Sequence, residues 1–144
     1  MNQKHTDILI IGLGLAGMTA AITAAKSGIK ISDYVIDGIE IVGRVKSVAL
    51  HTSEVVTVKS IQYGDEVLIE GNSFIVSGTN NDYLSFLRQK DYSQEYDFTY
   101  GQIAEVQKNY VNLILGKIDF FDKQPIIKTK KKFNLDNLRV IIND

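Results

Sequence analysis

Apolar residues follow three patterns along the chain, and each pattern predicts a different arrangement of elements. Residues 8–11 form an unbroken apolar run, which is typical of a strand that is covered on both faces. The alanine-rich residues 15–26 follow and predict a helix that lies close against a sheet, with Gly28 at its C-terminal end. The first pattern therefore predicts a strand, a turn and a helix.

Short β-type runs make up the second pattern, between residues 34 and 79. Turn residues separate these runs, namely Gly38, Gly43, Gly64-Asp65 and Gly71-Asn72. The predicted strands cover residues 34–36, 39–42, 45–50, 55–61, 66–70 and 74–77. Successive short strands joined by tight turns indicate an antiparallel β-meander.

The third pattern, from residue 80 onward, predicts helices and closing strands. Asn80 or Asn81 caps a short helix that runs to about residue 89. Thr99 and Gln102 have the spacing of a capping box, and the apolar positions after them follow helical spacing as far as Gly116. Residues 118–121 and 138–142 are predicted strands, the second of them as a partner for residues 8–11.

Together these patterns predict an α/β fold. A Rossmann-like βα unit at the N-terminus is followed by an antiparallel β-meander and then by a C-terminal helix with strands. The chain has 144 residues, which is the length of one domain with a single core. We therefore expect one domain over residues 1–144, divided into a strand-turn-helix unit (7–31), a β-rich segment (34–79) and a helix with strands (80–144).

Composition excludes several classes of site. Lys and Arg number 16 and Asp and Glu 17, and the net charge of −1 gives no electrostatic case for nucleic acid or an anionic membrane. The lack of cysteine excludes disulfides, redox dithiols and thiolate metal sites, and two histidines are too few for a multi-histidine metal site. No side chain stands out as an acid, base or nucleophile, so catalytic residues stay unknown. We interpret the lysine run 128–132 as protection of a solvated edge strand.

Three glycines between the first strand and the first helix have the G-x-G-x-x-G spacing of a dinucleotide-binding turn. Gly12 permits the tight turn, Gly14 lets a pyrophosphate approach the backbone, and Gly17 allows the helix to pack closely on the strand. Leu15 and Ala16 would present N–H groups of the helix N-terminus to the phosphates.

Residues 6–31, which contain this motif, resemble the N-terminus of FAD-dependent oxidoreductases. The resemblance implies that this stretch binds the ADP half of FAD, rather than NAD(P), and it weakens beyond residue 31. Family spacing places the ribose-binding acid at Val35, so the chain departs from the family there, and we expect Asp37 to hold the ribose instead. The leading prediction is a small or incomplete relative of these flavoproteins, cytoplasmic, with a dinucleotide as its partner and, if it is an enzyme, oxidoreductase activity.

Two alternatives belong to other functional classes. Residues 39–48 resemble the opening strand of an OB-like module, which would make the chain a non-enzymatic β-rich binding module. This segment has few basic or aromatic residues, which counts against nucleic acid as its ligand. Residues 8–25 lack charged side chains, and this run predicts a membrane anchor if it does not form the strand-turn-helix unit.

Overall fold

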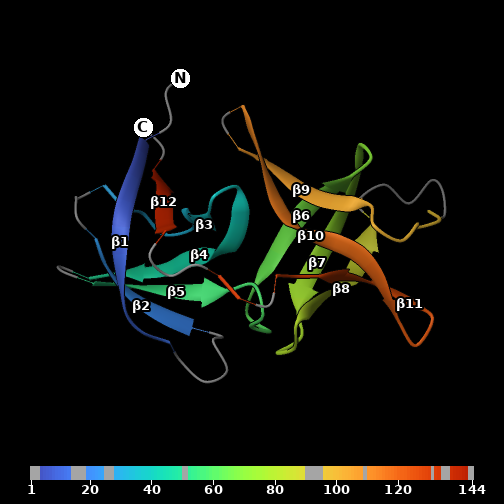
Figure 1. Ribbon diagram of the computed structural model, residues 1–144, viewed down its shortest axis with the longest axis horizontal. Coiled ribbons are helices and arrows are strands. Elements are labelled where there is room, and N and C mark those ends of the chain that lie inside the picture. The colour runs from blue at the N-terminus through green and yellow to red at the C-terminus, as the bar shows by residue number, and fades with distance from the viewer. Residues whose placement is uncertain are drawn as a thin grey trace.

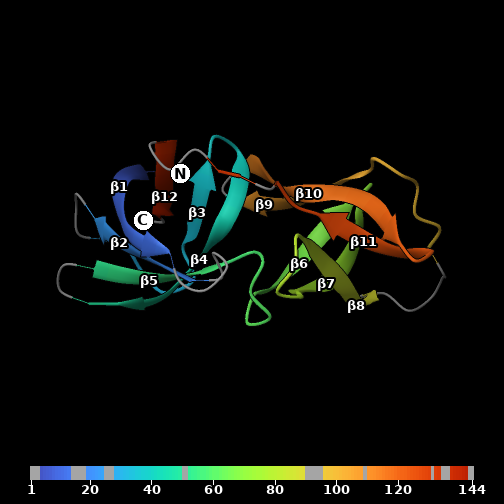
Figure 2. The same cartoon turned by 60° about the horizontal axis from the view of Figure 1, so that its bottom comes forward.

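The computed structural model describes residues 4–13, 19–24, 28–49, 52–89, 96–108, 110–130, 132–133 and 137–142 (Figure 1). Within these residues the chain forms twelve β-strands and no α-helix. The predicted α/β fold is therefore wrong, and the described chain is all-β. The strands form two lobes that lie side by side in both views of the ribbon (Figures 1 and 2).

The first lobe is a closed sheet of six strands from the two ends of the chain. Its strands are β1 (Lys4–Leu13), β2 (Thr19–Ala24), β3 (Tyr34–Asp37), β4 (Glu40–Val48), β5 (Thr52–Thr57) and β12 (Leu138–Ile142). Their order is β4-β3-β12-β1-β2-β5, and β5 pairs back onto β4. Every one of these pairings is antiparallel. Closure leaves no edge strand in this lobe.

The second lobe is a closed sheet of six strands from the middle of the chain. Its strands are β6 (Gly64–Ile69), β7 (Asn72–Gly78), β8 (Tyr83–Gln89), β9 (Ile103–Lys108), β10 (Val111–Phe121) and β11 (Gln124–Lys128). Their order is β11-β8-β7-β6-β9-β10, and β10 pairs back onto β11, again with antiparallel pairings throughout. A single parallel contact between β10 and β4, at Ile114 and Glu40, joins the two sheets.

Apolar packing is continuous between the lobes. The interior of the first lobe holds one cluster, which consists of Ile29, Val35, Val42, Val45, Val55, Leu138 and Val140. A larger cluster fills the second lobe around Val67, Leu84 and Leu113 and extends into the first lobe through Ile36 and Ile41. Because buried residues of β3 and β4 belong to the cluster of the second lobe, the two lobes share part of their core.

Within the predicted helix over residues 15–26, the described residues 19–24 form strand β2. Strands β1 and β2 are antiparallel, with Ile8 opposite Ala24 and Ile10 opposite Ile22. The outer edge of β1 pairs with β12 and the outer edge of β2 pairs with β5. Hydrogen-bonded partners on both edges override the helical preference of alanine. The predicted pairing of residues 138–142 with the first strand is present, but over residues 4–7 rather than 8–11.

The antiparallel pair β1–β2 includes part of the run that predicts a membrane anchor. Residues 8–13 and 19–24, which belong to the uncharged run 8–25, lie in strands of the first lobe. Among the described residues, no helix is long and hydrophobic enough to cross a membrane.

The predicted helix from Asn80 to residue 89 is strand β8. Asn80 has a φ of 66°, and its side-chain Oδ1 accepts a hydrogen bond of 2.8 Å from the backbone N–H of Ile61. Asn80 therefore stabilises the loop between the lobes instead of capping a helix. In β8, Leu84 is fully buried whereas Leu87 is 63% exposed. Residues three apart share a helix face but lie on opposite faces of a strand.

The predicted helix from Thr99 to Gly116 is a tight turn followed by β9 and β10. The side-chain Oε1 of Gln102 accepts a hydrogen bond of 2.8 Å from the N–H of Thr99, which is one half of the predicted capping box. Gly101 lies between them with a φ of 87°, and this left-handed conformation cannot continue into a right-handed helix. The capping interaction therefore closes a turn.

The six strands predicted between residues 34 and 79 correspond to five observed strands, because β4 runs through both of the predicted strands 39–42 and 45–50. These five strands are divided between the two lobes. Strands β3, β4 and β5 belong to the first lobe, and β6 and β7 belong to the second. Gly43 is not a turn residue, because it lies within β4, opposite Thr57 of β5. A Cβ at this position would overlap the carbonyl oxygen of Val56, so glycine allows the close approach of β4 and β5.

Candidate functional site

The structure describes two of the six residues that are predicted for the dinucleotide site, Gly12 and Asp37. Gly12 lies in β1, paired with Ala21 of β2, beyond the part of β1 that pairs with β12. Asp37 ends β3, on the other side of β12. The remaining predicted residues, Gly14, Leu15, Ala16 and Gly17, lie outside the described residues.

Asp37 has two side-chain partners within the protein. Its side chain is 7% exposed, and its Oδ2 atom lies 3.4 Å from the Nζ atom of Lys130. Its Oδ1 atom accepts a hydrogen bond of 3.4 Å from the side-chain amide of Asn137. Both partners belong to the segment that leads from the second lobe back to β12, so Asp37 anchors this segment to the first lobe.

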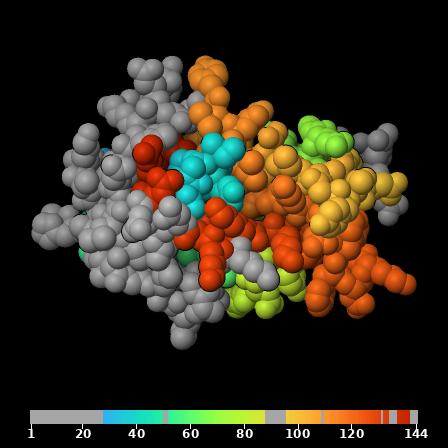
Figure 3. Space-filling view, in the orientation of Figure 1, coloured from blue at the N-terminus to red at the C-terminus, as the bar shows by residue number. Residues whose placement is uncertain are grey.

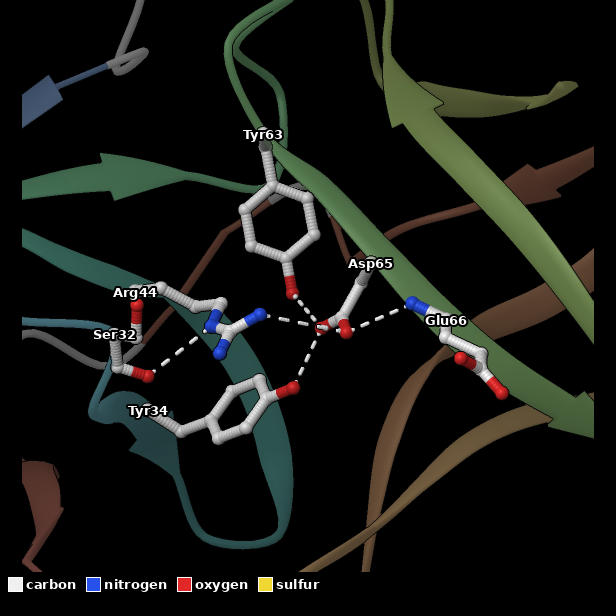
Figure 4. A network of polar contacts seen from close by, with 6 residues as sticks. All are labelled: Ser32, Tyr34, Arg44, Tyr63, Asp65 and Glu66. Atoms are coloured by element: carbon white, nitrogen blue, oxygen red, sulfur yellow. Dashed lines mark hydrogen bonds and ion pairs between the residues drawn. The ribbon is translucent and has the colours of Figure 1, made fainter.

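A second cluster of polar side chains lies where the chain passes from the first lobe to the second (Figure 4). Tyr34 on β3 and Arg44 on β4 are directly opposite each other. Tyr63 ends the connection between the lobes, and Asp65 lies near the start of β6. We call these four residues the junction network.

Asp65 is the centre of the junction network. Its Oδ2 atom accepts hydrogen bonds from the hydroxyl groups of Tyr34, at 2.7 Å, and Tyr63, at 2.9 Å. Its Oδ1 atom accepts a hydrogen bond of 2.9 Å from the N–H of Glu66 and lies 3.5 Å from Nη1 of Arg44. Four donors match the four acceptor positions of a carboxylate.

Arg44 is held by a contact on one face of its guanidinium and by a hydrogen bond at the edge of that group. Its guanidinium carbon lies 4.5 Å from the centre of the Tyr34 ring, which is a cation–π contact. Its Nε atom donates a hydrogen bond of 3.1 Å to the carbonyl oxygen of Ser32. The network therefore connects β3, β4 and β6 through a rigid set of partners.

The pKa shifts in the junction network indicate a structural role for its side chains rather than acid–base catalysis. Burial raises the pKa of the Tyr63 hydroxyl well above its ordinary value, and the negative charge of Asp65 raises it further. The pKa of Tyr34 is raised by the same two causes, in the same order. Both hydroxyls therefore keep their protons and act as hydrogen-bond donors, while Asp65 has no acceptor position left for a substrate proton.

A groove with a volume of about 600 Å³ lies at the lobe junction, between β10, the end of β11, the start of β4 and the turn at Tyr100. In Figure 3 the segments that line it, coloured cyan, orange and red-orange, meet on the face toward the viewer. Its charged residues are Glu40, Lys117, Asp119, Lys128 and Lys130. We call it the junction groove.

The lysines of the junction groove differ in their environments. Lys130 lies within 4.0 Å of carboxylate oxygens of both Asp37 and Glu40. Lys117 and Lys128 are exposed and directly opposite each other in the β10–β11 pair. Among the described residues, neither forms an ion pair with a carboxylate. The interpretation of the lysine run as an edge strand is wrong for β11, because β8 and β10 cover both of its edges.

Sequence reasoning missed the junction network and the pair formed by Lys117 and Lys128, which we call the lysine pair. The members of the network are up to 31 residues apart, and no spacing rule connects them. The lysine pair does have a local signal, because Phe121 and Gln124 close a two-residue turn. Counting outward from that turn places Lys117 opposite Lys128.

Comparison with protein families finds a match only in the N-terminal part of the chain. The family model described as an FAD binding domain matches residues 7–34. This match confirms the resemblance of that stretch to FAD-dependent oxidoreductases. No curated protein matches the chain by sequence.

Solved structures of MreC resemble the fold over nearly the whole chain. MreC from Listeria monocytogenes has a TM-score of 0.72 at 15% identity, over 98% of this chain and 75% of that chain. The major periplasmic domain of the cell shape-determining filament MreC has a TM-score of 0.68 at 15% identity, over 99% of both chains. A complex between penicillin-binding protein 2 (PBP2) and MreC from Helicobacter pylori has a TM-score of 0.66 at 10% identity, over 98% of both chains.

These findings correct the flavoprotein predictions. The FAD-type match is confined to residues 7–34, and there the structure has β2 where the phosphate-binding interpretation needs a helix. The MreC-like fold covers 98% of the chain, so the predictions of an FAD cofactor and of a dinucleotide partner are wrong. The predicted cytoplasmic location is contradicted by the likeness to a periplasmic domain. The alternative of a non-enzymatic β-rich binding module is the better supported one.

Proposed function

We propose that the chain is a non-enzymatic, extracytoplasmic binding module that contacts a penicillin-binding protein. The observation that carries the proposal is the two-lobed fold, which is similar to MreC over 98–99% of the chain. One of the similar MreC structures was solved in complex with PBP2. The same fold in this chain supports a partner of the same kind.

The described polar side chains support binding rather than catalysis. Asp65 accepts four hydrogen bonds or ion-pair contacts from within the protein, so it has no capacity left for a substrate. Tyr34 and Tyr63 hold their protons, because their pKa values are raised by burial and by Asp65. The junction groove offers an exposed tyrosine, a residue type that is enriched at protein contact surfaces, beside exposed lysines.

A direct binding measurement tests the proposal. The chain is immobilised and titrated with the extracytoplasmic part of PBP2 from the same organism, by biolayer interferometry. We expect saturable binding with a micromolar or lower Kd, and no binding to an unrelated all-β protein of similar net charge. Absence of saturable binding would overturn the proposed partner.

The location is tested separately. The protein is fused to alkaline phosphatase, which folds into its active form only after export. We expect phosphatase activity from this fusion and no fluorescence from a matched fusion to a protein that fluoresces only in the cytoplasm. The reverse result would overturn the extracytoplasmic location.

A further inference from the structure

We propose that the junction groove binds an acidic, extended segment of the penicillin-binding protein, and that Lys117 and Lys128 are its main contacts. This inference rests on the proposed function, which it deepens by assigning a surface and a partner chemistry. The surface is formed by both lobes, because β10 and β11 come from the second lobe and Glu40 from the first.

The first argument for an acidic ligand comes from the lysine pair. Lys117 and Lys128 are directly opposite each other on adjacent antiparallel strands, an arrangement in which like charges repel. Both are exposed, and no carboxylate among the described residues neutralises either of them by an ion pair. The lysine next along the groove, Lys130, is already engaged by Asp37 and Glu40. A negatively charged ligand that lies between Lys117 and Lys128 would relieve their repulsion.

The second argument, that the ligand is a protein segment, comes from the shape and lining of the groove. Its floor includes Gly116, where an added Cβ would overlap the backbone carbonyl of Lys128, so β10 and β11 approach closely there. The partly buried Ile114 adds apolar surface to the lining. Tyr100 is 74% exposed at the rim, and the turn that presents it is fixed by a 2.9 Å hydrogen bond from Gly101 to Ile118. An exposed tyrosine on a rigid turn, beside apolar surface, suits a protein segment.

The third argument comes from the acidic residues of the groove, because they restrict the kinds of ligand that the groove can bind. Glu40 and Asp119 line the groove together with the lysines. A continuous polyanion, such as nucleic acid or an anionic membrane surface, would meet these carboxylates as well as the lysines. The net charge of −1 adds no general attraction for such a polyanion. A peptide with a carboxylate at the level of the lysine pair matches the local charges better.

A pair of double variants tests the inference. Lys117→Gln with Lys128→Gln removes the charges in the groove, and Lys30→Gln with Lys123→Gln removes two exposed charges outside it. We expect the groove variant to bind PBP2 about tenfold more weakly than the unaltered chain, with a smaller effect of salt. We expect its unfolding temperature to be equal or higher, because it loses a repulsion. The control variant should bind like the unaltered chain.

The outcomes separate this inference from the proposed function. If the unaltered chain does not bind PBP2, the proposed function fails, and this inference fails with it. If the unaltered chain and the groove variant bind equally well, only the inference is overturned. Equal weakening by both variants would also overturn it, since the groove would then have no special part. Retention on phosphatidylglycerol vesicles that only the groove variant loses would assign the groove to a lipid surface instead.

Discussion

At the scale of single residues, Asp65 is a buried carboxylate with four partners within the protein. It joins side chains of β3, β4 and the connection between the lobes, and its own side chain is 7% exposed. A buried carboxylate with a full set of donors stabilises the fold only while every donor is present. The consequence is that a small chemical change at this residue has a large effect.

The first prediction concerns the charge of Asp65. Asp65→Asn keeps the shape but removes the charge opposite Arg44 and leaves fewer acceptor positions for the two tyrosines. We expect a loss of about 1–3 kcal/mol in the free energy of unfolding, measured by urea denaturation. Asp122→Asn is the matched control, because Asp122 is exposed in a turn with a φ of 49°, a conformation that asparagine tolerates. Equal stability of the two variants would contradict the role of Asp65.

The second prediction concerns alkaline pH. The pKa of Tyr63 is raised by burial, so in the unfolded chain this hydroxyl loses its proton first, near its ordinary pKa of about 10. Its contribution to stability is therefore complete below pH 10 and is lost as the pH rises above that value. One such tyrosine gives a slope of at most about 1.4 kcal/mol per pH unit.

Tyrosine-to-phenylalanine variants check this pH dependence. Tyr63→Phe should unfold with a shallower loss of stability above pH 10 than the unaltered chain, measured by urea denaturation at several pH values. Tyr110, which is 95% exposed, provides the control, and Tyr110→Phe should leave the slope unchanged. An unchanged slope in Tyr63→Phe would show that its hydroxyl titrates alike in the folded and unfolded chain.

At the scale of elements, the sequence predicts strands better than it predicts helices. Runs such as residues 34–36 and 138–142 are rich in β-branched and aromatic residues, and both are strands. The predicted helices relied on local features that also suit other structures. The alanines of β2 are accommodated between two strands, and the capping interaction of Gln102 closes a turn.

The candidate site was harder to predict, for a related reason. Asp37 is predicted to hold the ribose because it follows the apolar run 34–36, and in the structure it ends β3. Its partner Lys130 is 93 residues away, so the contact depends on the return of the chain from the second lobe. The lysine pair on β10 and β11 depends on the exact placement of one turn, and the turn sequence Asp122-Lys123 lacks the glycine that marks most such turns.

The third prediction concerns the close approach of β4 and β5. Gly43→Ala would place a Cβ against the backbone carbonyl of Val56, which cannot move without disturbing the β4–β5 pairing. We expect a loss of about 1–3 kcal/mol in the free energy of unfolding, measured by chemical denaturation. Gly64→Ala is the control, because a Cβ there would lie 3.6 Å from the nearest atom, the carbonyl oxygen of Val76. Similar losses in both variants would rule out the overlap as the cause.

At the scale of the whole molecule, the shared core determines how the two lobes behave. Ile41 of β4 is 1% exposed and belongs to the cluster that fills the second lobe. The junction network, the parallel contact of β10 with β4 and the Lys130–Asp37 pair add further connections. The lobes are therefore coupled by packing, by backbone hydrogen bonding and by charge.

The fourth prediction follows from this coupling and from the expectation of a single domain. We expect one calorimetric unfolding transition, with equal calorimetric and van't Hoff enthalpies. Ile41→Ala should shift this transition to lower temperature as a whole, by about 2–5 kcal/mol in stability. Ile39→Ala is the control, because Ile39 is 52% exposed. Two transitions, of which Ile41→Ala shifts only one, would show that the lobes unfold independently.

The position of β12 between β1 and β3 has a consequence for biosynthesis. All six strands of the second lobe, residues 64–128, leave the ribosome before β12 does, although the first lobe begins the chain. The lobe that is translated first is therefore the last to close. Until residues 138–142 emerge, β1 and β3 each expose an unpaired edge. The nascent chain thus has a period of aggregation risk that ends only when β12 has emerged and paired.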